Sequence, residues 1–292
     1  MSVLDTLCIE LTKKCPLRCQ HCSANAAPER TEMMPVGVLS KRLAELGRLS
    51  EVYLSGGEPF EHPDILAAIA ATSEVATSVI AYSSGTISVS ANVIGPLSKE
   101  TLASARQAGL HRIDLSLYSA LAAEHDEITE TNNSHDATCK SASNARQVGL
   151  EVGIHYVPMA TTIDNAEQLI RLAEHLGASR FHMLALTTQG RAKPNKAYSR
   201  LLPTERLLES LRHALTKHYS LELIISSGLR QLLGVFDSVA QARKKSSFMD
   251  VDGFLYPGEG HQDRLLRSRS SILNDSSIEA LAMEVELRKP NK

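Results

Sequence analysis

Three cysteines lie within eight residues near the start of the chain, in the run Cys15-Pro-Leu-Arg-Cys19-Gln-His-Cys22. Such crowding is typical of a metal site rather than of a disulfide framework. Three thiolates can hold three irons of a four-iron cubane and leave the fourth iron without a protein ligand. That iron would be free to bind a small molecule and pass an electron to it. The alternative is a zinc site in which His21 supplies the fourth ligand.

A second motif, Ser55-Gly56-Gly57-Glu58-Pro59, follows the second strand that we expect. Two consecutive glycines allow the backbone to pass close to a ligand, because they carry no side chain. The Glu58 carboxylate can accept hydrogen bonds from an ammonium group, and such charge-assisted bonds are strong. Alone, such a run is more often an ordinary turn, and its position after the cysteine motif is what gives it a functional interpretation.

The two motifs together resemble the radical S-adenosylmethionine (SAM) superfamily, which carries Cys-x3-Cys-x2-Cys after the first strand and Gly-Gly-Glu-Pro after the second. The resemblance implies an enzyme that cleaves SAM reductively to a 5′-deoxyadenosyl radical, which abstracts hydrogen from an organic substrate. It implies one [4Fe–4S] cluster on Cys15, Cys19 and Cys22. It places SAM beside Gly56, Gly57 and Glu58.

The same resemblance implies three further contacts with SAM. Ser83 lies in the run Tyr82-Ser-Ser-Gly-Thr86, which closes the third strand and resembles the family's polar loop near the methionine carboxylate. Ser116 would reach the ribose or the carboxylate, and Leu186 would contact the adenine. The alternatives are ordinary strand hydroxyls and a core leucine.

The second half of the chain resembles the SPASM and twitch subgroup of that superfamily. Residues 125–129 and 189–192 match segments common in the subgroup, and residues 247–258 match its C-terminal hairpin. Asp252-Gly253 between apolar runs predicts this hairpin, because both residues tolerate positive φ. However, Gly258 stands where a cluster-binding cysteine would follow Tyr-Pro, and no cysteine follows Cys139. We therefore expect a hairpin without an auxiliary cluster.

Strand-like and helix-like patterns alternate along the chain and must position these motifs. We expect strands at residues 3–11, 51–55, 78–83, 112–118, 150–157 and 180–186. We expect helices at residues 36–46, 63–72, 99–108, 134–148 and 165–176. Six strand–helix repeats indicate an α/β fold with parallel strands, a partial (β/α)6 TIM-like barrel. We place this barrel at residues 1–192 and a small α+β, twitch-like extension at residues 193–292.

Composition excludes several classes of function. The 292 residues have a formal net charge of −2, so we expect neither nucleic acid nor an anionic membrane as partner. No apolar run approaches the roughly 20 residues that span a bilayer, and no signal peptide is evident at the start. We expect a cytoplasmic protein.

The substrate is the least determined feature. A small metabolite or natural-product intermediate is favoured, because a first strand near residue 3 leaves no room for a leader-binding domain before it. A ribosomal peptide is the alternative within the family, and a zinc-stabilised, non-catalytic binding protein is the alternative outside it. A one-electron reductant such as flavodoxin or ferredoxin is implied by the family.

Several single residues have both a structural and a functional interpretation. We expect Cys8 to be a buried apolar residue and Cys139 to be structural rather than a hydrogen donor. Of His155 and Tyr156, one should face the barrel interior, where it could contact substrate. Further arginines could bind an anionic group, although a solvated surface is the default interpretation; they are Arg264, Arg267 and Arg269, near His261.

Overall fold

The computed structural model describes residues 4–192, 201–235, 245–258, 267–274 and 276–287. One nine-stranded sheet dominates it, in the order β11-β10-β1-β2-β3-β6-β7-β8-β9. All neighbouring strands are parallel except the antiparallel pair β10 and β11. The strands are β1 (Thr6–Thr12), β2 (Leu49–Gly56), β3 (Ala76–Ser83), β6 (Arg112–Ser116), β7 (Glu151–Tyr156), β8 (Arg180–Met183), β9 (Glu222–Ile225), β10 (Ser246–Met249) and β11 (Leu255–Pro257).

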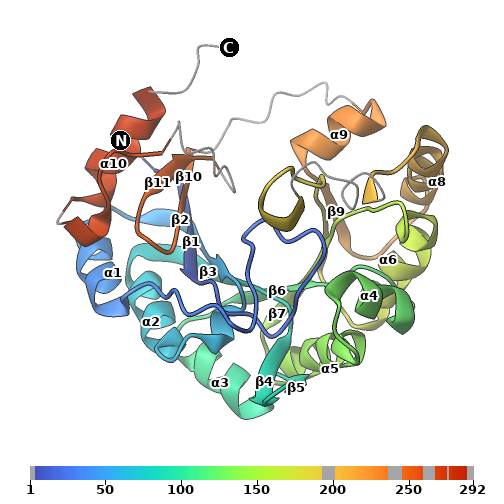
Figure 1. The fold of residues 1–292 in the computed structure, drawn as a ribbon, viewed down its shortest axis with the longest axis horizontal. Coiled ribbons are helices and arrows are strands. Elements are labelled where there is room, and N and C mark those ends of the chain that lie inside the picture. Colours follow the sequence, from blue (N-terminus) through green and yellow to red (C-terminus); the bar gives the residue numbers. More distant parts are fainter. Residues whose placement is uncertain (1–3, 193–200, 236–244, 259–266, 275, 288–292) are drawn as a thin grey trace.

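Helices cover the outer face of the curved sheet (Figure 1). The helices are α1 (Val36–Leu43), α2 (Ile65–Val75), α3 (Lys99–Gln107), α4 (Ala122–Thr129), α5 (Ser134–Gln147), α6 (Ala166–His175), α8 (Glu205–Leu215), α9 (Ser227–Leu233) and α10 (Ile278–Leu287), of which α4 packs on α5. Short 3-10 turns are η1 (Pro59–Glu61), η2 (Ile163–Asn165), η3 (Gly190–Ala192) and η4 (Ile272–Asn274). A separate hairpin is formed by β4 (Thr86–Ser90) and β5 (Val93–Pro96).

Alternation along the strands separates two faces of the sheet, because successive side chains point in opposite directions. On β1, Leu7, Ile9 and Leu11 pack into the main core beneath the helices. Cys8 belongs instead to a second cluster, on the inner face, with aromatic residues of β2 and β10. The inner face is therefore the side on which polar and aromatic side chains meet.

The predicted α/β fold is confirmed, and the sheet is open, so the barrel is partial. Five predicted helices agree with α1, α2, α3, α5 and α6 to within three residues at each end. Helix α4, helix α9 and the small hairpin β4–β5 were not predicted. Strands from the C-terminal part extend the sheet at both edges, since β9 pairs with β8 and β10 pairs with β1.

The C-terminal hairpin forms as predicted, but its turn differs. Of the turn residues between β10 and β11, only Gly253 has a positive φ, of 76°. Gly253 N donates to Asp250 O at 2.9 Å, and Asp250 N donates to Phe254 O at 3.0 Å. The turn is therefore longer than two residues, and the prediction that Asp252 shares the left-handed conformation was wrong.

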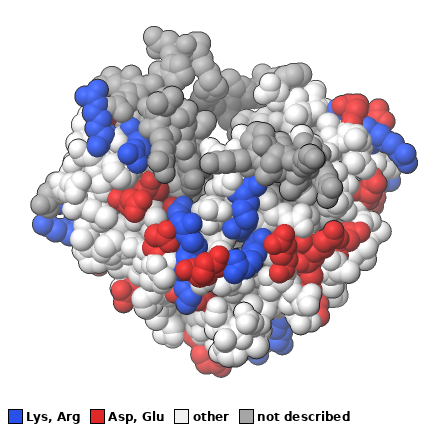
Figure 2. All heavy atoms as spheres, viewed as in Figure 1, with Lys and Arg blue, Asp and Glu red and all other residues white. Residues whose placement is uncertain are grey.

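The charged surface agrees with the composition. On the face shown in Figure 2, Lys and Arg lie beside Asp and Glu instead of forming a patch of one sign. Oppositely charged side chains also form ion pairs, such as Arg18–Glu29 at 2.7 Å and Lys14–Glu61 at 2.8 Å. No helix in the described ranges is long and apolar enough to cross a bilayer.

Candidate functional site

The three cysteines lie in the loop that follows β1 and crosses the centre of the view in Figure 1. Cys15, Cys19 and Cys22 are unpaired and pack in one small cluster with Leu17 and Ala26. Cys15 is buried, whereas the other two are partly exposed. The structure thus brings the three predicted ligands together at the carboxyl end of a parallel strand, where α/β folds place their sites.

Helix α4 holds one side of this loop. The amides of Arg18 and Gln20, on either side of Cys19, donate to the carbonyls of Thr129 at 3.1 Å and Ile128 at 2.9 Å. These carbonyls belong to the last turn of α4, where they have no partner within the helix. The helix end therefore fixes the backbone around Cys19.

Arg191 holds the other side. Its Nε donates to Cys19 O at 2.8 Å and its Nη1 to Ala26 O at 2.7 Å, while its backbone N donates to Cys22 O at 2.9 Å. Gly190 has a φ of 57°, and a Cβ there would lie 2.2 Å from Cys22 O. Residues 189–192, noted for their resemblance to the subgroup, thus act on the cysteine loop itself.

The glycine motif is bound to the same loop. Gly57 N donates to Thr12 O at 2.6 Å, and Glu58 N donates to Lys14 O at 2.8 Å. A Cβ on Gly57 would lie 2.2 Å from Lys14 O, and one on Gly56 would lie 2.4 Å from Thr12 O. Both glycines are therefore needed for the motif to lie against the segment just before Cys15.

Glu58 is fully buried and joins the second motif to the end of β3. It accepts hydrogen bonds from Ser83 Oγ at 2.8 Å, from Ser84 N at 2.7 Å and Oγ at 2.6 Å, and from Phe60 N at 3.2 Å. Burial raises the pKa of Glu58 to about 7, although these donors act in the opposite direction. Ser84, which the sequence analysis did not single out, contributes two of the donors.

Burial disfavours deprotonation of two of the three thiols. Burial, with a smaller contribution from the neighbouring thiols, raises the pKa of Cys15 well above its ordinary value and that of Cys19 to about 12. Metals bind thiolates, so the energy for deprotonation must come from the bound metal. Of the described residues, only one trio of ligand atoms lies within the 4.8 Å that suits a single ion, and it is not the cysteine trio. The cysteines therefore fit the separate corners of a cluster better than one zinc ion.

Aromatic and apolar side chains line the other side of the loop. Tyr118, two residues past Ser116, contacts the ring of His21 edge-on at 4.5 Å and forms a hydrogen bond with the Ser116 side chain. Leu186 packs in the same cluster as Tyr118 and Cys19. The structure therefore places Ser116 and Leu186 beside the cysteine loop.

Comparison with known families decides the identity of this site. The family described as the radical SAM superfamily matches residues 9–176, more than half of the chain. The chain belongs to the radical SAM superfamily. The cofactors of this superfamily are SAM and a [4Fe–4S] cluster, and the donor set of three neighbouring thiols fits the cluster.

Individual relatives of this radical SAM protein are more distant. The PqqA peptide cyclase of Methylobacterium sp. (strain 4-46) is 29% identical over 229 residues, which cover 75% of this chain and 58% of the cyclase. The AdoMet-dependent heme synthase of Oleidesulfovibrio alaskensis is 26% identical over 191 residues, which cover 63% of this chain and 46% of the synthase. The chain thus spans little more than half the length of the cyclase.

Solved structures share the fold at lower identity. Streptococcus suis SuiB bound to its precursor peptide SuiA has a TM-score of 0.74 and 15% identity, covering 100% of this chain and 68% of SuiB. Native anSMEcpe with bound AdoMet has a TM-score of 0.70 and 13% identity, covering 98% of this chain and 81% of anSMEcpe. At these identities the likeness establishes the partial radical SAM barrel only.

Polar residues occupy the inner face of the radical SAM barrel. His155 faces this interior and contacts the rings of Tyr82 at 4.4 Å and His182 at 4.9 Å, whereas Tyr156 packs in the outer core. Asp114 pairs with Arg112 through two contacts, of 2.8 and 3.2 Å. Burial lowers the pKa of His155 to about 4, so its imidazole is neutral at pH 7. The expectation that one of residues 155 and 156 faces the interior is confirmed.

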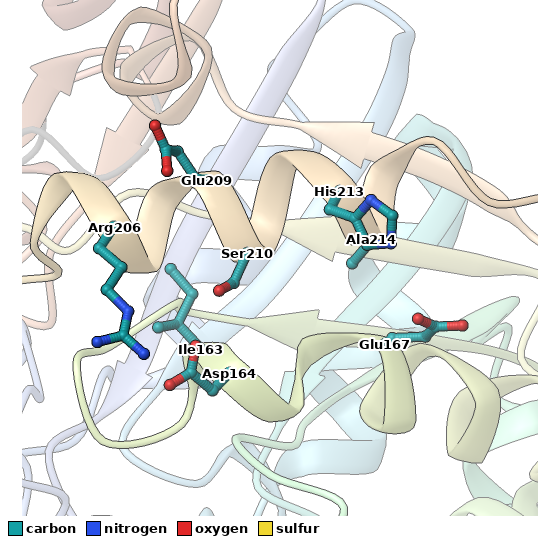
Figure 3. Close-up of a pocket in the computed structure, with 8 residues that line it drawn as sticks. All are labelled: Ile163, Asp164, Glu167, Arg206, Glu209, Ser210, His213 and Ala214. Atoms are coloured by element: carbon teal, nitrogen blue, oxygen red, sulfur yellow. The ribbon is translucent and has the colours of Figure 1, made fainter.

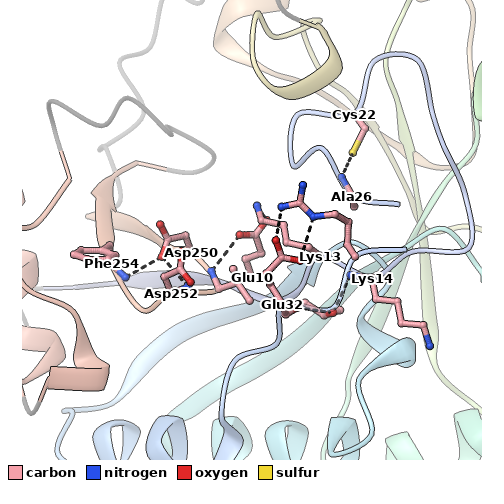
Figure 4. A network of polar contacts seen from close by, with 12 residues as sticks. Glu10, Lys13, Lys14, Cys22, Ala26, Glu32, Asp250, Asp252 and Phe254 are labelled. Atoms are coloured by element: carbon pink, nitrogen blue, oxygen red, sulfur yellow. Dashed lines mark hydrogen bonds and ion pairs between the residues drawn. The ribbon is translucent and has the colours of Figure 1, made fainter. Parts of the chain in front are cut away.

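The C-terminal hairpin contacts both the inner face and the segment before the cysteines (Figure 4). Glu10, two residues before the end of β1, accepts from Val251 N at 3.1 Å and from Lys13 Nζ at 2.6 Å. Phe248 and Tyr256 pack with Cys8 and its aromatic neighbours. Cys8 is buried as expected, and Cys139 is partly buried beside the main core.

Two remaining features lie apart from the cysteine loop. A surface pocket of about 490 Å³ lies between η2, α6 and α8, on the outside of the barrel, and none of its lining residues belongs to the site (Figure 3). Of the C-terminal basic residues, His261 and Arg264 lie outside the described residues. Arg267 stacks on Phe254 at 4.2 Å, and Arg269 pairs with Glu284 at 3.8 Å.

Proposed function

We propose that this chain cleaves SAM reductively and uses the resulting 5′-deoxyadenosyl radical to abstract a hydrogen atom from a peptide substrate. One observation carries the first half. The cysteine loop and the Gly-Gly-Glu-Pro motif are bound to each other through Gly57 N–Thr12 O and Glu58 N–Lys14 O. This contact supports a cluster on Cys15, Cys19 and Cys22 beside the motif to which we assign the SAM amino group.

The chain's own residues would then hold SAM and exclude water. In this proposal Gly56, Gly57, Glu58, Ser83 and Ser116 surround the polar part of SAM. Leu186 contacts the adenine. Because the Glu58 oxygens already accept from Ser83 and Ser84, the carboxylate also orders the loop that completes this surface.

The peptide substrate is supported by the relatives. One relative is named as a cyclase of the peptide PqqA, and SuiB was solved bound to the precursor peptide SuiA. The small metabolite that the sequence analysis favoured remains the second candidate, because the AdoMet-dependent heme synthase also matches over 63% of the chain.

Partners and location complete the proposal. A one-electron reductant such as flavodoxin or ferredoxin would supply the electron, and the cytoplasm, a reducing compartment, would keep the three cysteines free of disulfides. Residues 193–292 would act as a twitch-like extension without a cluster. The packing of Phe248 and Tyr256 on the inner face supports a covering role for this extension.

The test is anaerobic reconstitution with iron and sulfide, followed by incubation with SAM and dithionite. We expect mass spectrometry to detect 5′-deoxyadenosine. When a candidate peptide is deuterated at the reacting carbon, we expect the 5′-deoxyadenosine to contain deuterium. The matched control is the Cys22→Ala variant. Protein that binds zinc but no iron, and yields no 5′-deoxyadenosine, would exclude the proposed activity.

A further inference from the structure

We propose that Asp114, His155 and His182 form a second metal site, on the inner face of the barrel, for one divalent transition-metal ion such as zinc or iron(II). This inference goes beyond the proposed function and does not depend on it.

The three residues come from three adjacent strands. Asp114 lies on β6, His155 on β7 and His182 on β8, and the two histidines are direct neighbours across the sheet. One ligand atom from each residue lies within 4.8 Å of the others, and His155 Nε2 is 3.6 Å from Asp114 Oδ2. Ligands about 2.1 Å from a tetrahedral zinc ion lie about 3.4 Å apart, so small side-chain rotations would close the site.

A second observation is independent of this spacing. The Nε2 atoms of both His155 and His182 are buried and have no hydrogen-bond partner in the described part of the protein. The 3.6 Å contact with Asp114 is too long for a hydrogen bond. A buried polar atom without a partner is costly. Two such atoms, on two histidines that each bring a ring nitrogen to within 4.8 Å of the Asp114 carboxylate, therefore point to a cation as the missing partner. His155 itself is only 8% exposed.

The surroundings hold the carboxylate in place. Arg112 donates to both oxygens of Asp114, as outer residues commonly do for a metal-binding carboxylate. Gly153 lies opposite Asp114 on β7, and a Cβ there would lie 2.1 Å from Asp114 Oδ1. Because Gly153 has no side chain, the Asp114 carboxylate can occupy this position next to the histidines.

The donor set determines the class of ion. Two neutral imidazoles and one carboxylate suit zinc or iron(II) and leave coordination positions open. The positive charge of Arg112 opposes any cation, so affinity must come mainly from the imidazoles. The open positions would face the barrel interior, where an oxygen of the substrate could bind.

The experiment measures metal content rather than activity. Full-length protein, reconstituted anaerobically, is dialysed against zinc and desalted, and iron and zinc are measured per chain. We expect one zinc in addition to the cluster iron. His155→Asn and His182→Asn should each weaken zinc binding by at least the roughly 10–100-fold that is typical of losing an outer residue. His175→Asn, the same change at an exposed histidine of α6, should not.

A second measurement separates this site from the cysteines. The Cys15→Ala/Cys19→Ala/Cys22→Ala protein, titrated with cobalt(II), should show the visible bands of nitrogen and oxygen ligands without thiolate charge transfer. The proposal is overturned if holoprotein and triple variant take up only substoichiometric metal, or if either histidine variant, shown to be folded by circular dichroism, binds zinc as wild type does. Absence of SAM cleavage would leave the metal count unaffected, so the two proposals fail separately.

Discussion

At the scale of single residues, the contacts of Glu58 show how a motif predicted to bind a ligand also builds its own surroundings. The carboxylate has no exposed surface, and its four protein donors come from two other segments, η1 and the end of β3. Burying a carboxylate without donors would cost several kcal/mol. The serines after β3 therefore make burial of Glu58 possible, and Glu58 in turn fixes their loop.

The cysteines provide the first prediction. Replacing any one of Cys15, Cys19 or Cys22 by Ala should abolish SAM cleavage, because two thiolates cannot hold the cluster with one iron free. Most of the fold should remain, since the loop lies at a strand end. Iron content and circular dichroism after reconstitution measure the two effects. An alanine variant with full iron would exclude that cysteine as a ligand.

Glu58→Gln provides the second prediction. Its amide nitrogen cannot accept the bonds that Ser84 and Ser83 donate, and a buried donor left unsatisfied costs about 1–3 kcal/mol. We expect SAM affinity, measured by calorimetry on the reconstituted protein, to fall about tenfold or more. Glu29→Gln, at an exposed carboxylate paired with Arg18, is the matched control. Unchanged affinity in Glu58→Gln would remove Glu58 from the SAM site.

At the scale of elements, the cysteine loop depends on two segments more than 100 residues away from it, α4 and η3. Arg191→Lys tests η3. A lysine ammonium cannot reach the carbonyls of both Cys19 and Ala26 in the geometry of a guanidinium. Bonds from charged groups contribute about 1.5–3 kcal/mol each, so we expect loss of most iron on desalting. Arg206→Lys, exposed on α8, should retain it. Equal iron in the two variants would show that Arg191 does not support the loop.

Helix α4 gives a prediction of pH dependence. His125 Nδ1 accepts from Tyr118 N at 3.1 Å, and burial lowers the pKa of His125 to about 3. Below pH 6.5 the unfolded chain binds a proton that the folded chain refuses, so the free energy of unfolding falls as pH falls toward 3. At two pH units below the ordinary pKa of histidine, the free energy of unfolding is lower by roughly 2–3 kcal/mol.

His125→Asn isolates this contribution, because asparagine offers an acceptor but does not titrate. The difference in unfolding free energy between wild type and variant should shrink between pH 7 and pH 4.5, as measured by urea unfolding of the cluster-free protein. Parallel pH profiles would assign acid sensitivity to other groups.

Sequence patterns predict these elements unevenly, for physical reasons. Regular helices such as α6 show one apolar face and are predicted to within a residue, and the cysteine and Gly-Gly-Glu-Pro spacings locate the cluster ligands. Helix α4 lacks such a face; only His125, Ile128 and Thr129 are buried. Asp114, His155 and His182 lie on three separate strands, so only the observed register brings them together.

At the scale of the whole molecule, the C-terminal hairpin is part of the sheet and not an appendage. Met249, Leu255, Ile272 and Ile278 lie in the same core cluster as the barrel strands. Deleting residues 246–292 would therefore expose this core and the edge of β1. Such a deletion would unfold part of the barrel as well as remove the hairpin, so loss of iron would not report on covering. Substitution of a single side chain of the hairpin is the better test of whether it covers the inner face.

Phe254→Ala is that test. Phe254 is partly buried, packs against the second cluster with Phe248 and Tyr256, and lies under Arg267. Removing its ring should cost less than the about 3–5 kcal/mol of a fully buried phenylalanine and should leave iron content unchanged. It should also admit water to the inner face, where the radical is to be protected. We expect 5′-deoxyadenosine formation without substrate to rise severalfold relative to wild type and to Leu232→Ala, which shortens an exposed side chain of α9. If Phe254→Ala instead loses half its iron, the hairpin supports the cluster; if substrate-free cleavage is unchanged, Phe254 has no covering role.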